Sequence, residues 1–568
     1  MKEQKVIKKL FAFALISVAI IVVLKDAYNI ENGWVHPETT FYHIKFLTNS
    51  TFEKFELSFS LEELEKLFWW EEVFDGSQNR ILTGLFALVD IKFRPWLFQY
   101  IPPNPAVSLS WLLTLFFTPL LLYNFLRRYI RLDIIGSAAV TVLFIASPAT
   151  VGNTFELFHP GKILAVFFYI LALNIFMVVN NLALANKKNR TKQISFFILA
   201  ALTLYLSLFT DPYIYAILFL IPVFLPKMFI NPANIKHPGY CFKNNSSARK
   251  NIMYVRKILK QFAGFLRPAS YEIYVIYGVV VATFFLTVFW ALPQLANSAG
   301  YSYKFMQVFR HQIDSGQPAP HLVLLNWRYY TAILINIYWF VMANAGLGDF
   351  LPISMASLSN LSPHHWWPLL NIENTIIYSL FHTICWAFYS FFRNNYGLFR
   401  NVFTKIAACY LITAWITLVH GHYYFFVPYA TFIYGSPFSI FFAIFAGAVL
   451  YSFRKNRKVH SILIIAVLTS AVFSYQDSKE MNRDLKGQWY GAGTDMDAIY
   501  RDSRQLWNDI KYNGKTFDQN LLKIDERIRN NYLKAKDPHD KYYVKIWIEL
   551  STNKEYLKAM HFAAFGKD

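Results

Sequence analysis

The sequence predicts an all-α, polytopic membrane protein, and three observations lead to that fold class. Of 568 residues, 55% are hydrophobic and only 16% are charged, whereas about 25% charged residues is usual in soluble domains. The apolar residues gather in runs that approach the length of about 20 helical residues needed to cross the hydrocarbon core. The net charge of +20 is concentrated between those runs rather than spread along the chain.

Basic clusters follow several apolar runs and set the expected orientation. Loops that stay on the cytoplasmic side of a membrane are biased toward Lys and Arg. The same position favours anionic membrane lipids as partners and argues against nucleic acid. The stretch from 212 to 271, for example, carries nine Lys or Arg and no Asp or Glu. The other clusters lie at 127–131, 187–192 and 454–458.

We expect about eleven spans, with the N-terminus inside and the C-terminus outside. No small-residue cleavage site follows the first apolar run, which ends at Lys25 and Asp26, so this run is expected to be retained as a helix. The run at 331–346 is expected to be re-entrant or interfacial, because a span there would place 454–458 outside. The expected spans are 9–24, 108–126, 133–151, 163–184, 194–210, 213–230, 273–292, 375–392, 406–421, 437–453 and 460–475.

Three large segments then share the outer face. The first, 25–107, holds twelve acidic and seven basic residues, and its apolar spacing predicts amphipathic helices lying in the membrane interface. The second is 293–373. The third, 476–568, mixes both charges with aromatic residues and is expected to form a small helical extramembrane domain. The expected domains are therefore a transmembrane bundle over 1–475 and a soluble segment over 476–568.

Carboxylates gather in the first outer segment. Asp26 follows the first apolar run, and Glu71, Glu72 and Asp75 stand in "WWEEVFDGSQNR". Carboxylates held at the membrane surface can accept a proton from a hydroxyl, or hold a divalent cation such as Mg²⁺ or Mn²⁺ beside a leaving phosphate. Arg80 can pair with a carboxylate or bind a phosphate. The alternative is that 71–75 is a solvated face and turn beside an anchored helix.

This layout resembles the GT-C superfamily of polytopic glycosyltransferases. The resemblance rests on the basic N-terminus, one helix, and an acidic outer segment with interfacial helices. It implies a polyprenyl-phosphate-linked sugar as donor and an essential Asp or Glu near the end of the first helix. The matching positions are Asp26 in "VLKDAYN" and, more loosely, Glu71, Glu72 and Asp75. The paired acidic signature of that family is absent, since Ala27 follows Asp26.

Other outer residues are candidates for binding phosphate or substrate. A lysine at a helix N-terminus can neutralise a phosphate, although the stretch around Lys162 is equally typical of an ordinary turn. The histidines of "VHGHYY" lie at i and i+2, which does not place both on one helix face and disfavours a zinc site. They also suit an interfacial belt. The candidates are His159, Lys162, Arg310, Arg328, His420 and His422.

The leading hypothesis is a glycosyltransferase of a prokaryotic inner membrane. It would move a sugar from a polyprenyl-phosphate donor to a glycan, lipid or protein acceptor. An O-antigen or polysaccharide polymerase or ligase is one alternative, and it would depend on outer arginines such as Arg310 and Arg328. A lipid-linked sugar transporter or flippase is another, and it would carry ionisable residues within its spans. A membrane scaffold that binds partners through 476–568 is the last.

Overall fold

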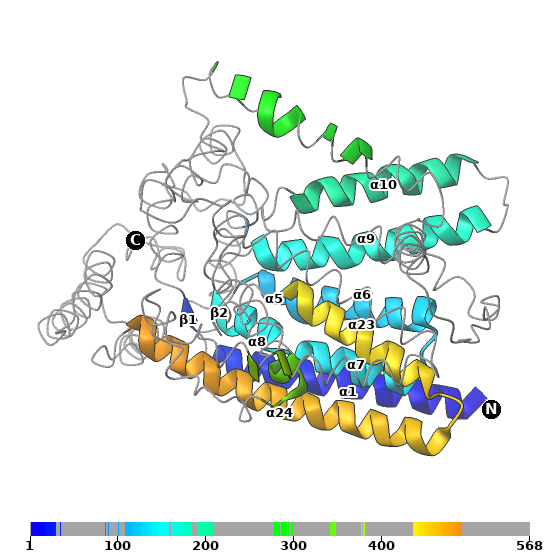
Figure 1. Ribbon diagram of the computed structural model, residues 1–568, viewed down its shortest axis with the longest axis vertical. Helices are drawn as coiled ribbons and strands as arrows, with labels where there is room; N and C mark the ends of the chain where they lie inside the picture. The colour runs from blue at the N-terminus through cyan, green and yellow to red at the C-terminus, as the bar shows by residue number, and fades with distance from the viewer. Residues whose placement is uncertain are drawn as a thin grey trace, which may run out of the picture.

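The computed structural model describes residues 2–29, 34–35, 108–157, 161–184, 190–208, 341–347 and 436–490, with single residues or short pieces within 86–100, 278–298 and 376–380 (Figure 1). Almost all of this is helix. The exception is one pairing of two-residue strands, β1 (Trp34–Val35) and β2 (Glu156–Leu157). The helical fold class predicted from the sequence is therefore confirmed over the described residues.

Two described helices are long and apolar enough to cross a membrane. They are α1 (Lys2–Tyr28) and α24 (Arg457–Tyr490). A third span is possible if α7 (Ile134–Ile145) and α8 (Pro148–Phe155) count as one, although they bend by 51° at the break between them. The sequence predicted one span there, and Pro148, which lacks a backbone N–H, begins the second half. The larger number of about eleven spans stays a prediction.

A nearly continuous helical run leads into α7. Two π-helical turns alternate with α-helix along it, and the run ends at Arg131, whose backbone is left-handed (φ 60°). Asn124 and Asn174 join this run to α9 (Gly161–Leu184) by a 2.8 Å hydrogen bond. The segments of the run are α5 (Ser110–Leu112), η1 (Leu113–Phe117), α6 (Thr118–Phe125) and η2 (Leu126–Ile130).

The bundle is organised around α7, which packs against α1, α24 and α23 (Ser436–Ser452). On the other side α6, α9 and α10 (Arg190–Leu208) stack in turn, as Figure 1 shows. Small residues permit close approach. A Cβ added at Gly447 of α23 would lie 2.7 Å from a methyl carbon of Leu126. The packing therefore fixes α23 against the run that leads into α7.

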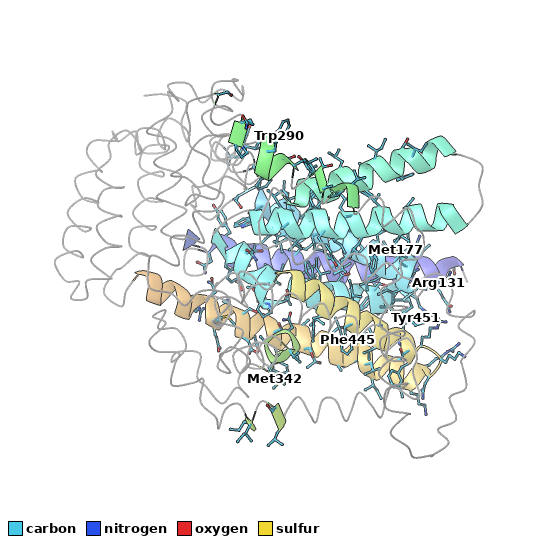
Figure 2. The ribbon with its side chains drawn as sticks, turned by 45° about the horizontal axis from the view of Figure 1, so that its top comes forward. Arg131, Met177, Trp290, Met342, Phe445 and Tyr451 are labelled. Carbon is cyan, nitrogen blue, oxygen red and sulfur yellow. The ribbon has the colours of Figure 1, made fainter. Side chains whose placement is uncertain are left out.

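One end of the bundle collects positive charge. The N-terminus of α1, the turn between η2 and α7, and the turn between α23 and α24 all lie there (Figure 1), and Figure 2 shows Arg131 and Tyr451 at this end. We call this end of the bundle the basic end. The exposed cations of the basic end are Lys8, Lys9, Arg128, Arg131, Arg454, Lys455, Arg457 and Lys458.

The end of the expected re-entrant segment is held against α24. Gly346 has φ +68°, and a Cβ there would lie 2.6 Å from the Ser474 amide nitrogen. The Ser474 hydroxyl donates to the Ala343 carbonyl (3.0 Å), and the Ser439 hydroxyl lies 3.3 Å from the Asn344 side chain. Residues 341–347 are thus fixed between α23 and α24. Whether the whole of 331–346 spans or re-enters stays a prediction.

Candidate functional site

Asp26 is brought to one side of α1 by the pattern of that helix. Its buried side chains recur at helical spacing, namely Ala12, Ile16, Ile20, Val23 and Ala27. This stripe packs on the α7–α8 pair, while residues such as Ile21 and Val22 are exposed. Asp26 therefore lies at the edge of the stripe, in the last turn of the helix.

The partners of Asp26 come from α24. Its Oδ2 accepts a hydrogen bond of 2.6 Å from the Tyr475 hydroxyl and one of 2.8 Å from the Lys479 Nζ. Tyr475 and Lys479 are four residues apart, so they lie on one face of the helix. Each follows a fully buried serine, Ser474 or Ser478, so this face borders the buried side of α24. Two helices about 450 residues apart in the chain thereby meet at one carboxylate.

We call Asp26, Tyr475 and Lys479 the Asp26 cluster, and its charged side chains are only partly shielded from solvent. The side chains of Asp26 and Lys479 are 22% and 27% exposed. The Phe155 ring meets the Tyr475 ring edge to face, with centroids 6.5 Å apart. Hydrogen bonds with an ionised partner are roughly twice as strong as neutral ones, so the bonds from Tyr475 and Lys479 hold the carboxylate in place. The remaining exposure of the Asp26 side chain leaves the carboxylate accessible to solvent.

Two short strands pair with each other, and they follow the ends of α1 and α8 in the sequence. β1 and β2 run parallel, with Trp34 opposite Glu156. β2 begins where α8 ends, directly after Phe155. Trp34 and Val35, at the start of the long segment that follows α1, are therefore tied by backbone hydrogen bonds to the end of α8, whose Phe155 contacts Tyr475.

The chemistry of this cluster is that of a carboxylate paired with an ammonium. The carboxylate can take up a proton, and the ammonium can face a phosphate. Lys479 and Tyr475 already donate to Oδ2, so this arrangement does not fit a divalent cation at that oxygen. Within the residues that the structure describes, no group of three His, Cys, Asp or Glu side chains is placed to hold a metal.

Most of the other sequence candidates cannot be placed. Lys162 is in the first turn of α9, and only its backbone is described. The sequence interpretation did not name Tyr475 or Lys479 as site residues. It made Tyr475 the last residue of the final span and left Lys479 beyond it, whereas α24 continues to Tyr490. The candidates outside the described residues are Glu71, Glu72, Asp75, Arg80, His159, Arg310, Arg328, His420 and His422.

A second carboxylate cluster lies at the basic end. Asp133 caps the N-terminus of α7, where its Oδ1 accepts from the Gly136 amide at 2.9 Å. Its Oδ2 lies 2.5 Å from Nε2 of His460, in the first turns of α24. Burial by itself would raise the pKa of Asp133, but the hydrogen bonds from Gly136 and His460 outweigh it, so the pKa lies below its ordinary value.

No family model, no curated protein and no solved structure matches this chain.

Proposed function

We propose that the chain is a membrane glycosyltransferase, which transfers a sugar from a polyprenyl-phosphate donor to a glycan, lipid or protein acceptor. The observation that carries the proposal is the Asp26–Lys479 pair (2.8 Å) at the end of the first helix. The GT-C resemblance expects an essential carboxylate at that place. The pair adds a cation beside it, and transfer from a phosphate-linked sugar needs both a proton acceptor and a positive charge.

The length of α24 supports a site at the outer membrane surface. Lys479 follows His460 by about 19 residues, or 28 Å of α-helix at 1.5 Å per residue. The hydrocarbon core of a bilayer is about 30 Å thick. If α24 crosses the membrane, the two clusters then lie near opposite surfaces. With the basic end inside, Asp26 faces outward, as in the proposed topology of about eleven spans in a prokaryotic inner membrane.

The proposed reaction uses the side chains in distinct roles. The acceptor hydroxyl oxygen bonds to the anomeric carbon as the bond from that carbon to the phosphate oxygen breaks. The hydroxyl proton passes to the Asp26 carboxylate. The electron pair of the broken bond leaves with the phosphate, whose charge Lys479 faces, while Tyr475 orients the carboxylate. Glu71, Glu72, Asp75 and Arg80 remain candidates for completing this site from the first outer segment.

The test is transfer of a labelled sugar from a polyprenyl-phosphate donor by purified full-length protein. We expect Asp26→Asn to lower the rate by about 10²–10⁴-fold, because an amide accepts the same hydrogen bonds but cannot take up the proton. Glu480→Gln is the matched control, since it removes an exposed carboxylate from the same stretch of α24. Its rate should equal that of the wild type.

Two results would redirect the proposal. Wild-type transfer by Asp26→Asn, combined with loss on replacing Arg310 or Arg328, would favour a polysaccharide polymerase or ligase. Movement of unmodified lipid-linked sugar across liposomes by the purified protein would instead favour a transporter. Either outcome would remove Asp26 from the role of catalytic base.

A further inference from the structure

The His460 ring joins three elements at the basic end. Its Nδ1 lies 3.0 Å from the Leu450 carbonyl oxygen in the last turn of α23, and its Nε2 lies 2.5 Å from Oδ2 of Asp133 at the start of α7. His460 itself is in the first turns of α24, which Asn456 caps by accepting from the Val459 amide at 3.3 Å. One imidazole therefore holds an end of each of these three helices.

Counting protons shows which form of the ring fits this geometry. A carbonyl oxygen only accepts hydrogen bonds, so Nδ1 must donate. An ionised carboxylate also only accepts, so Nε2 must donate as well. The lowered pKa of Asp133 keeps that carboxylate ionised near neutral pH. Only the form of the ring that carries a proton on both nitrogens can donate to both acceptors.

Some charges around the His460 ring favour its protonated form, and others disfavour it. Asp133 stabilises the imidazolium, as does the C-terminal end of α23, where the helix dipole is negative. The N-terminal end of α24 and the neighbouring cations oppose it. The titratable and charged groups on these elements at the basic end include Tyr123 in α6, Arg127, Arg128 and Tyr129 in η2, Arg131 and Asp133 before α7, Tyr451 in α23, Arg454 and Lys455 after it, Arg457 and Lys458 in α24, and Lys8 and Lys9 in α1.

We propose that Asp133, His460 and the Leu450 carbonyl form a proton-controlled clip, which fastens α24 to both α7 and α23 when the His460 ring carries two protons and loses one of these two attachments when one proton leaves. A neutral ring has one N–H for two acceptors, so one bond is lost and an acceptor nitrogen faces the carboxylate. Histidine is the side chain that changes charge between pH 5 and 8. Raising the pH through that range therefore tests whether the loss of one ring proton weakens the clip.

Thermal unfolding of the full-length protein from pH 5.5 to 8.5 tests the clip directly. The wild-type Tm should fall by about 2 °C or more as the pH rises, beyond the change seen in His460→Gln. In Asp133→Asn the new amide can donate to the neutral ring, so this component of the pH dependence should disappear. Glu480→Gln removes an exposed charge 20 residues farther along the same helix and should keep the wild-type profile.

Hydrogen exchange locates the effect, because the protein has 14 histidines that all contribute to a global melting curve. After correction for the intrinsic pH dependence, amides at 457–463 should exchange about tenfold faster at pH 8 than at pH 6, as expected when a hydrogen bond to a charged group is lost. His460→Gln and Asp133→Asn should lack this difference. Equal wild-type protection at both pH values, or a wild-type profile in His460→Gln, would overturn the proposal.

Discussion

Two carboxylates from early in the chain meet α24 near opposite ends of the bundle, and their partners differ. Asp26 pairs with Lys479 and Tyr475, and its side chain is 22% exposed. Asp133 pairs with His460, is 45% exposed, and also caps α7. Lysine stays charged throughout the physiological pH range, whereas histidine as a residue type changes its charge within it. The Asp26 cluster therefore suits an ion pair that persists at all physiological pH values. The Asp133 cluster suits an interaction whose strength depends on pH.

The largest effect on stability is expected when the ion pair between Asp26 and Lys479 is broken. Lys479→Ala leaves the Asp26 carboxylate without its cation in a partly shielded place, and the free energy of unfolding should fall by about 1–3 kcal/mol. A double-mutant cycle with Asp26→Ala measures the coupling. The double variant should be less destabilised than the sum of the single variants. Strictly additive losses would show that the two groups do not stabilise each other.

A smaller effect is expected from the tyrosine in the same cluster. Tyr475→Phe keeps the ring that meets Phe155 but removes the hydroxyl bound to Asp26, so the loss should be about 1 kcal/mol. Tyr451→Phe is the matched control near the basic end, because its buried hydroxyl has no hydrogen-bond partner in the described structure. That control should be neutral or slightly stabilising in the same unfolding measurement. Equal losses in both variants would contradict the assigned role of the Tyr475 hydroxyl.

The smallest effect is expected at the turn that leads to Asp133. Arg131 adopts φ 60°, a conformation that costs a side-chain-bearing residue roughly 1–2 kcal/mol and costs glycine little. Arg131→Gly relieves this strain but gains flexibility in the unfolded chain. The Tm should therefore rise slightly. Arg131→Ala separates strain from charge, since it removes the guanidinium and keeps the Cβ, and it should give no such rise.

The sequence predicted the helices more fully than it predicted their contacts. Apolar runs located α1, α9, α10, α23 and the membrane-length part of α24, because a helix in lipid must be apolar along its length. Two features were not predicted. Pro148 bends the expected span at 133–151, and α24 continues past 475 through a polar stretch whose Ser478 and Asn482 are buried. Burial there depends on neighbours that local hydropathy does not include.

Of the candidate site, the sequence supplied Asp26 but not its partners. The position of a carboxylate after the first apolar run is a local feature, and it sufficed to select that residue. Its contacts with Tyr475 and Lys479 join positions about 450 residues apart in the chain. The only local signal at 475–479 is a spacing of four, which is common on helices. The pairing of Asp133 with His460 was missed for the same reason.

The unbroken course of α24 connects its contact at His460 with its contact at Lys479. About 28 Å of helix separates the two residues, so a rotation of about 5° about His460 would displace Lys479 by about 2.5 Å. The contact between Lys479 and Asp26 is 2.8 Å long, so this displacement is comparable with the whole bond. A small rotation at one end of the bundle would thus be enough to separate the charges near the other.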